Sequence, residues 1–245
     1  SGNIRGVLTS RRQNGHHIGS FALYGYQKDP NVKGHLIIDE EAAAVVREVF
    51  TLFSKGYGKT AIARILNQRG IPNPTEYKRL KGLRYKRPKD NNSTLWKYSA
   101  ISHMLSNEIY IGNMVQGKYE SISYKTKKCR PRPKDQWYIV ERTHAPIIDR
   151  PLWDRVQGLI AQKSKPFRNG RIGLFAGKVR CGYCDYILRS AKNRGKYYLQ
   201  CQTRHISKDA CVGTFMPVAE LEQMVIAELN RLTAVYLNKD ELERK

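Results

Sequence analysis

Four cysteines near the end of the chain constrain its fold more than any other feature. Cys181 and Cys184 form a Cys-x-x-Cys pair, and Cys201 and Cys211 follow with sixteen and then nine residues between successive cysteines. A tetrahedral zinc ion binds four thiolates at about 2.3 Å, and a Cys-x-x-Cys turn supplies two of them from one short loop. The spacing therefore predicts a zinc ribbon that holds one structural Zn²⁺ through these four side chains.

Alternative roles for the cysteines have less support in the sequence. The second pair is wider than a usual zinc knuckle, so His205, which lies between Cys201 and Cys211, is an alternative ligand. A redox Cys-x-x-Cys pair would need a βαβ context, and paired disulfides would suit a secreted chain. The sequence offers neither context. The fifth cysteine, Cys129, has no neighbouring partner in the sequence and is expected to be a free thiol.

The segments around the cysteines predict a hairpin and a helix. β-rich runs at 186–190 and 196–200 are joined by turn residues at 193–195. After Pro217, apolar residues fall on one helical face. They are Leu221, Val225, Leu229 and Leu232. This helix either packs on the ribbon or begins a coiled coil, although one such stretch is shorter than the three or four heptads that identify a coiled coil.

The charge balance indicates a polyanionic partner. The chain has 44 Lys and Arg against 21 Asp and Glu, a formal net charge of +23. Nucleic acid is favoured over a membrane because no stretch reaches the ~18 apolar residues of a spanning helix, and no signal peptide opens the chain. The sequence therefore predicts an intracellular protein. Its 245 residues suffice for one sizeable core and one small module that depends on metal.

The first half of the chain predicts a basic arm followed by two helices. Residues 1–20 are polar and glycine-containing and are expected to be extended. Helical spacing begins after Asp39, the expected N-cap, and a second helix is expected over 59–69, so the pair suggests a helix-turn-helix. The apolar stripe of the first helix is Ala42, Val45, Val46, Val49, Phe50 and Phe53.

A third helix is expected over 99–106, capped by Ser99, with Trp96 and Tyr98 fixing its start. A helix-turn-helix presents the polar side chains of one helix to base edges in the major groove. The polar face expected to do so is Ser99, Ser102, His103 and Ser106. Simple solvent exposure is the alternative interpretation of such a face.

Two long loops concentrate the positive charge. One spans 71–95, and the other joins predicted strands at 110–115 and 136–140. Contact with DNA phosphates would relieve the repulsion between these cations and order the loops. The alternative interpretation is that both loops are charged segments exposed to solvent without a partner. A helix over 151–162 closes the first domain, and the basic segment 163–176 follows as a linker.

No motif argues for catalysis. Gly58-Lys59-Thr60 resembles the end of a phosphate-binding loop, but the glycine that this loop requires five positions earlier is Phe53. Four cysteines would close the coordination sphere of zinc, which leaves no open position for chemistry. The chain itself is therefore expected to have no catalytic residues.

Several short motifs follow one another in a specific order. They are Ala22-Leu23-Tyr24-Gly25-Tyr26, Asp39-Glu40-Glu41-Ala42, Ile62-Ala63-Arg64-Ile65-Leu66-Asn67, Gly70-Ile71-Pro72, Met104-Leu105-Ser106-Asn107, Tyr110-Ile111-Gly112, His144-Ala145-Pro146-Ile147-Ile148 and the cysteines. Together they resemble the C-terminal region of large serine recombinases, which comprise phage integrases and mobile-element transposases. The resemblance covers residues 20–235. Leu23 stands where the family often has proline, and no coiled-coil insertion is visible in the zinc module.

The resemblance implies a function in DNA recombination. Members cut and rejoin two DNA sites through an N-terminal catalytic-serine domain, which is expected to be missing here, with residues 1–20 as its trailing helix and linker. The implied partners are double-stranded DNA at an attachment or transposon-end site and other recombinase protomers in a synaptic complex. The implied location is the bacterial or phage-infected cytoplasm, at the nucleoid. The alternative is a zinc-ribbon transcriptional regulator or an RNA-binding protein, with Tyr183, Tyr197 and Tyr198 as stacking residues.

The sequence thus predicts an α+β fold, in which a mainly helical, helix-turn-helix-like domain with a small β-ribbon precedes a zinc ribbon with a C-terminal helix. The expected divisions are an arm at 1–20, a recombinase domain at 21–162, a linker at 163–176 and a zinc-ribbon domain at 177–240. The residues expected to contact DNA are Arg11, Arg12, Lys78, Arg79, Lys81, Arg84, Lys86, Arg87, Ser99, Ser102, His103, Lys125, Lys127, Lys128, Arg130, Arg132, Lys165, Arg168, Lys192, Arg194 and Lys196.

Overall fold

The chain divides into two compact units, Ser1–Pro166 (unit 1) and Phe167–Lys245 (unit 2), and each is described by itself. The computed structural model describes residues 2–84, 94–122, 126, 128–163 and 173–236. Within these ranges no helix is both long enough and apolar enough to cross a membrane.

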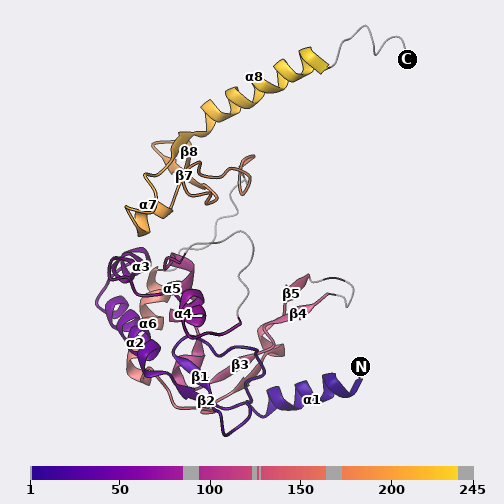
Figure 1. The fold of residues 1–245 in the computed structure, drawn as a ribbon, viewed down its shortest axis with the longest axis vertical. Helices are drawn as coiled ribbons and strands as arrows, with labels where there is room; N and C mark the ends of the chain where they lie inside the picture. Colours follow the sequence, from indigo (N-terminus) through magenta and orange to yellow (C-terminus); the bar gives the residue numbers. More distant parts are fainter. Residues whose placement is uncertain (1, 85–93, 123–125, 127, 164–172, 237–245) are drawn as a thin grey trace. The chain divides into compact units, whose positions relative to one another are not determined.

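Figure 1 labels most of the helices and strands. The helices are α1 (Gly2–Gln13), α2 (Glu40–Ser54), α3 (Lys59–Gln68), α4 (Pro74–Leu80), α5 (Tyr98–Leu105), α6 (Arg150–Lys163), α7 (Thr203–Ile206) and α8 (Val218–Tyr236), with 3-10 turns η1 (Glu108–Ile111) and η2 (Lys134–Gln136). The strands are β1 (Tyr26–Lys28), β2 (Leu36–Ile38), β3 (Met114–Gln116), β4 (Tyr119–Ser121), β5 (Cys129–Pro131), β6 (Tyr138–Val140), β7 (Arg189–Asn193), β8 (Lys196–Gln200) and β9 (Phe215–Pro217). These mixed elements confirm the α+β class.

Helix α2 forms the centre of unit 1 and contacts α3, α5, α6 and β1. The 3.6-residue spacing of its apolar residues places them on one face, and all of the expected stripe is buried except Val45, which is half-buried. Asp39 stands at the N-cap position, but its carboxylate does not cap the helix. It accepts the Tyr77 hydroxyl at 2.9 and 3.0 Å instead. Burial and this bond raise the pKa of Tyr77 to about 12, which keeps the donor protonated.

Two helices replace segments that were expected to be irregular. Residues 2–13 form α1 rather than the extended arm expected from composition, whereas the resemblance did imply a helix at the start of this segment. Helix α1 contacts β6, where the Arg12 guanidinium lies 5.8 Å from the centre of the Tyr138 ring. Tertiary contact of this kind is invisible to local composition. Within the expected loop 71–95, α4 begins at Pro74, and the Asn73 side chain caps it by accepting two backbone N–H bonds. The sequence Asn73-Pro74 is typical of a helix N-terminus and could have predicted α4.

The start of α5 differs from the expectation. The helix begins at Tyr98 with Lys97 at the N-cap, and no side chain caps it, so Ser99 lies exposed within the first turn. Trp96 does fix this start, because its indole N–H donates to the Ile71 carbonyl at 2.9 Å and the side chain is fully buried. Tyr98 does not, since 55% of its surface is exposed.

The central ribbon of unit 1 is shorter than expected. Residues 108–111 form η1, and only Met114–Gln116 pairs with Tyr138–Val140, while β4 and β5 form a second hairpin beyond them. Gly112 causes the break: its φ is +88°, and a Cβ atom there would lie 2.8 Å from the His144 carbonyl oxygen. Only glycine tolerates both the positive φ and the close approach of the carbonyl oxygen, because it has no Cβ atom.

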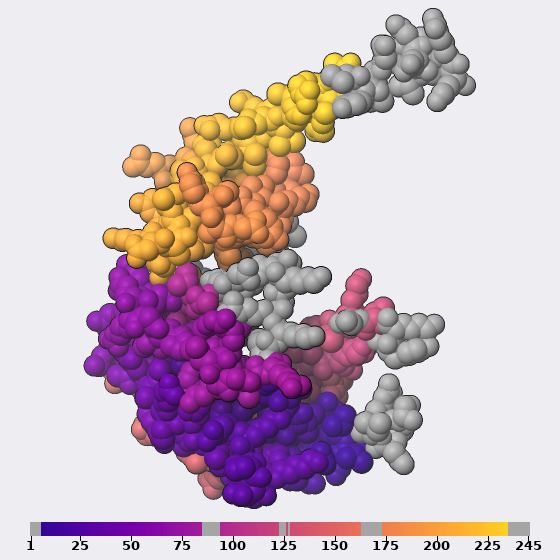
Figure 2. Space-filling view, viewed as in Figure 1, coloured from indigo at the N-terminus to yellow at the C-terminus, as the bar shows by residue number. Residues whose placement is uncertain are grey.

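Unit 2 contains an antiparallel sheet in the order β7–β8–β9. The first strand begins later than expected, at Arg189, because the turn is the two-residue Arg194-Gly195, whose φ values of 45° and 84° suit a type I′ hairpin. Helix α8 packs only its first turns on this unit, through Val218 and Leu221. Its later apolar residues are exposed, and Figure 2 shows that part of α8 (yellow) projecting from the rest of unit 2.

A buried histidine makes the stability of unit 1 depend on pH. His144 Nε2 donates to the Ile109 carbonyl at 2.8 Å, and Nδ1 lies 2.7 Å from the Thr143 hydroxyl. Burial lowers the pKa of His144 below 6.5 in the folded protein. The contribution of neutral His144 to the free energy of unfolding is therefore complete above pH 6.5. It is lost as the pH falls below 6.5, by at most about 1.4 kcal/mol per pH unit.

Denaturant unfolding between pH 5 and 7.5 measures this loss. The variant His144→Gln keeps a donor for Ile109 without titrating in this range, so its unfolding free energy should vary less with pH. An equal pH dependence in both proteins would assign the effect to other groups, such as His17, whose pKa burial also lowers.

Candidate metal centre and nucleic-acid interface

The fold of unit 2 brings the four expected cysteines together. Their sulfur atoms all lie within 4.8 Å of one another, although the residues are up to 30 positions apart in the chain. Cys181 and Cys184 come from the turn before the sheet, Cys201 follows β8, and Cys211 precedes β9. Cys181, Cys201 and Cys211 are each at most 4% exposed.

The distances suit a tetrahedral metal ion and exclude disulfides. The Sγ atoms of Cys181 and Cys211 are 3.6 Å apart, as are those of Cys184 and Cys201, and those of Cys201 and Cys211 are 3.8 Å apart. A disulfide would need about 2.05 Å. Four sulfurs at about 2.3 Å from a tetrahedral centre lie about 3.8 Å apart. A four-sulfur donor set of this size fits Zn²⁺.

Hydrogen-bond donors surround the sulfurs. The Thr214 hydroxyl lies 3.1 Å from Cys181 Sγ, the Thr203 hydroxyl 3.4 Å from Cys184 Sγ, and the Gly213 N–H donates to Cys211 Sγ at 3.2 Å. Burial acts to raise the pKa of Cys181, but the bond from Thr214 and backbone N–H donors outweigh it and lower this pKa to about 6. Such donors stabilise thiolates, the form that binds metal. Burial nevertheless raises the pKa of Cys201 and Cys211.

The remaining candidates for the metal site lie elsewhere. His205 Nε2 is 2.8 Å from the Gln200 side-chain amide and is not part of the cysteine cluster. Cys129 is exposed on β5 in unit 1. Among the described residues, the four cysteines form the only group of three or more His, Cys, Asp and Glu side chains that could hold a metal ion.

The polar side of α5 forms a second candidate site together with the start of α3. Lys59 Nζ donates to Ser102 Oγ at 2.9 Å and lies 5.3 Å from the centre of the Tyr98 ring. Ser99, His103 and Ser106 are exposed. The expected polar face is therefore present, and it gains two residues that the sequence had assigned to other roles, Lys59 and Tyr98. The only available signal was that Tyr98 stands four residues before Ser102 on the same helix. The contact of Lys59 depends on how α3 packs on α5.

Most basic side chains of α4 are engaged within unit 1. Arg79 pairs with Glu76, and Lys81 Nζ lies 2.9 Å from a carboxylate oxygen of Glu41. Lys78 Nζ lies 5.4 Å from the centre of the Phe21 ring, and burial lowers the pKa of Lys78. A phosphate that approaches these residues must displace existing partners, so each is a weaker phosphate contact than its charge suggests.

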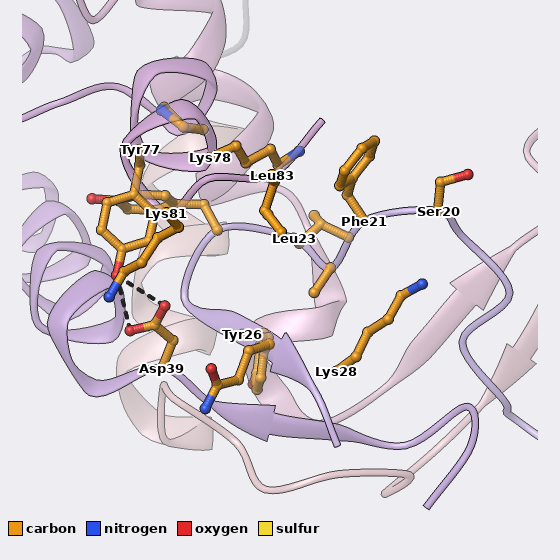
Figure 3. A pocket seen from close by; sticks show the side chains of 14 residues that line it. Ser20, Phe21, Leu23, Tyr26, Lys28, Asp39, Tyr77, Lys78, Lys81 and Leu83 are labelled. Atoms are coloured by element: carbon orange, nitrogen blue, oxygen red, sulfur yellow. Dashed lines mark hydrogen bonds between the residues drawn. The ribbon is translucent and has the colours of Figure 1, made fainter. Parts of the chain in front are cut away.

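Lys78 and Lys81 also border a cleft of about 380 Å³ (Figure 3). Figure 3 shows apolar side chains such as Phe21 and Leu83 on its wall, and to their left Tyr77 bonded to Asp39. This cleft places apolar surface next to cations. It does not gather the expected phosphate-binding residues into one patch.

The hairpin β4–β5 carries both paired and unpaired cations. Arg130 Nε lies 2.6 Å from Glu120, and the Arg132 guanidinium lies 5.7 Å from the centre of the Tyr138 ring. Arg84 and Lys128 are exposed, and no carboxylate pairs with either in the part of the chain that the structure describes. Among the expected contacts of unit 1 that the structure describes, these two are the most open to a phosphate.

The other expected contacts are scattered or lie outside the described residues. Arg11 and Arg12 are half-buried on α1, and Arg12 Nε is buried without a hydrogen-bond partner among the described residues. Lys192, Arg194 and Lys196 are exposed around the β7–β8 turn, where Lys192 Nζ lies 5.3 Å from the Tyr197 ring centre. The expected contacts outside the described residues are Lys86, Arg87, Lys125, Lys127, Lys165 and Arg168.

Comparison with known proteins covers both units. A family model described as Recombinase matches residues 40–163, which is about half of the chain, and one described as Recombinase zinc beta ribbon domain matches residues 174–230. The Bacillus subtilis (strain 168) protein described as "Uncharacterized protein YefB" is 26% identical over 144 residues, which is 59% of this chain and 48% of the relative. The chain thus spans about half the length of this curated relative.

Two solved structures are also similar. One, described as "Sequence Requirements of the Listeria innocua prophage attP site", has 20% identity and a TM-score of 0.41, and the match covers 94% of this chain and 87% of that one. The other, described as "Crystal Structure of a LSR-DNA Complex", has 20% identity and a TM-score of 0.40, with 93% and 66% covered. The family assignment stands on the two family models, whose order confirms the resemblance to large serine recombinases. The chain belongs to the recombinase family and carries its recombinase domain followed by its zinc β-ribbon domain.

Proposed function

We propose that this chain binds double-stranded DNA sequence-specifically at recombination attachment sites. It would be the DNA-recognition region of a large serine recombinase or transposase that integrates or excises a mobile element. The observation that carries the proposal is the succession, in one chain, of a recombinase domain and a recombinase zinc β-ribbon domain. The net charge of +23 supports a polyanionic partner.

The cysteine cluster is proposed to hold one structural Zn²⁺ through Cys181, Cys184, Cys201 and Cys211. The sulfur distances and the zinc β-ribbon match support this assignment. With four protein ligands the coordination sphere is closed, so the ion would stabilise unit 2 and take no part in chemistry.

Base reading is assigned to α5 and positioning to the exposed cations. Ser99, Ser102 and His103 would face base edges, with Lys59 beside them on a phosphate. Side chains such as Arg84 and Lys128 would contact phosphates without reading sequence.

A matched pair of variants separates these roles. His103→Ala is expected to relax discrimination at one or two base pairs by about tenfold, because base-edge contacts set sequence preference. Lys128→Ala is expected to weaken all duplexes about equally and to reduce the salt slope by about one. Fluorescence anisotropy with the selected site and single-base variants measures both. If His103→Ala instead weakened all duplexes equally and Lys128→Ala relaxed base discrimination, α5 would contact phosphates and the segment around Lys128 would read the bases.

Strand cleavage is proposed to belong to a catalytic-serine domain of a longer parent, which would act with other recombinase protomers in a synaptic complex in the bacterial cytoplasm, at the nucleoid. The difference in length from the curated relative is consistent with a longer parent. The alternative function, a zinc-ribbon regulator or RNA-binding protein, predicts either no recombination-site preference or tighter binding to single-stranded RNA than to duplex DNA. A competition assay between the two nucleic acids decides between them.

A further inference from the structure

The sheet of unit 2 has one face against the cysteine cluster and one face that α8 does not cover. Side chains alternate along β8, so Leu199, 2% exposed and packed with the cysteines, lies on the covered face. Tyr198 lies on the opposite face, and it stacks on Phe215 of β9, which confirms that these two share a side. We call this second side the aromatic face; by the same register its residues are Arg189, Ala191, Asn193, Lys196, Tyr198, Gln200, Phe215 and Pro217.

The aromatic face presents a flat ring to solvent. The ring centres of Tyr198 and Phe215 are 4.5 Å apart with 23° between their planes, and Phe215 is 59% exposed. Ala191, which pairs with Tyr198 across the strands, is too small to cover the rings. An aromatic pair that is stacked, exposed and held on a rigid sheet is a surface on which another flat ring can stack.

The segment that forms β7 and β8 is rich in cations. Residues 186–207 contain five cations, Arg189, Lys192, Arg194, Lys196 and Arg204, and no Asp or Glu. Arg189 and Lys196 project from the aromatic face by the alternation of β7 and β8. The ligand that complements flat rings flanked by cations is a planar base attached to a phosphate backbone.

We propose that the aromatic face binds single-stranded DNA by stacking an unpaired base on Phe215, with Arg189 and Lys196 on the adjoining phosphates. A base in an intact duplex is stacked on its neighbours and offers no free ring face, so this activity is distinct from duplex recognition. The choice of DNA over RNA rests on the proposed function, which brings the module to DNA. Tyr197, named with Tyr198 as a stacking candidate for the alternative RNA-binding function, lies on the other side of the sheet beside Lys192.

The test uses the full chain loaded with zinc and a fluorescent (dT)12 probe, with a duplex of equal length as comparison. Phe215→Ala is expected to weaken (dT)12 binding about tenfold or more and duplex binding less than about threefold, since stacking contributes only to the unpaired base. The control is Tyr197→Ala, which removes a 55% exposed aromatic residue from the neighbouring position on the opposite face. It should change (dT)12 binding less than about twofold. Zinc content per chain is measured for every variant.

Phe215→Trp keeps a stacking ring and guards against a folding artefact. It should retain (dT)12 affinity, and the fluorescence of the new indole should be quenched on binding. Equal loss of (dT)12 binding in Phe215→Ala and Tyr197→Ala, or no quenching in Phe215→Trp, overturns the proposal. Equal loss of duplex and (dT)12 binding assigns Phe215 to the duplex interface and also overturns it.

Two further results separate this inference from the proposed function. Tighter, Phe215-dependent binding of (rU)12 than of (dT)12 overturns the choice of DNA. In the other result, the unaltered chain binds (dT)12 but no duplex, and Phe215→Ala loses the (dT)12 binding while Tyr197→Ala keeps it. The proposed duplex recognition then fails, and the proposal for the aromatic face stands.

Discussion

Replacing Cys201 with serine is expected to unfold unit 2 and to leave unit 1 folded. Cys201 is 1% exposed and packs among the other cysteines, Leu188 and Leu199. A structural zinc site of this kind contributes about 10–16 kcal/mol of apparent binding free energy in small zinc domains, and there it amounts to the folding free energy. The described part of unit 2 has a small core, so it has little other stabilisation to offset the loss of the ion.

The measurement is zinc per chain together with limited proteolysis, which reports on each unit separately. The matched control is Cys129→Ser, which removes the exposed fifth cysteine and should change neither zinc content nor cleavage. A Cys201→Ser protein with full zinc and a protected unit 2 would disprove the ligand assignment. A chelator applied to the unaltered chain should reproduce the Cys201→Ser cleavage pattern, and unit 1 should stay intact because its core contains none of these cysteines.

Duplex binding is expected to weaken about 10⁴-fold between about 50 and 200 mM monovalent salt. If eight cations neutralise phosphates, the logarithm of the binding constant falls with the logarithm of salt concentration at a slope near −7, from about −0.9 per phosphate contact. Titrations at four or more salt concentrations give the slope, and a slope between zero and about −2 would contradict an interface built on phosphate neutralisation.

The structure also predicts which cations contribute to this slope. Lys128 is exposed without a carboxylate partner among the described residues, whereas Arg79 and Arg130 already pair with Glu76 and Glu120. Replacing Arg130 with alanine should therefore change the slope less than replacing Lys128. Equal changes would show that the ion pairs open freely when DNA binds.

Elements with a strong local pattern could be predicted from the sequence. The stripe on α2 follows from 3.6-residue spacing, which involves only residues close together in the chain. The cysteine cluster could be predicted because the Cys-x-x-Cys turn and two further cysteines are a recognisable ligand set, although its members are up to 30 positions apart. Helix α1 could not be predicted from composition, since it has little apolar periodicity and contacts β6 about 125 residues away. The break at Gly112 depends on the His144 carbonyl, which no local pattern shows.

The candidate nucleic-acid surface was predicted less well than the metal centre. Counting cations located the basic segments, but it could not show that Lys81 pairs with Glu41 across 40 residues. Nor could it show that Lys59 reaches Ser102 and Tyr98 on another helix. A sequence shows which residues are charged, whereas only the fold shows which of them already pair with another side chain.

Selection of duplex DNA from a randomised pool tests the central claim most directly. The full chain is used at two salt concentrations, and zinc per chain is measured on the same sample. Sequence-specific recognition by two DNA-binding units predicts one enriched site of about two helical turns, roughly 20 base pairs, with one zinc per chain. Tight binding without enrichment of any sequence would contradict attachment-site recognition and would leave a basic zinc protein that binds DNA through phosphates alone.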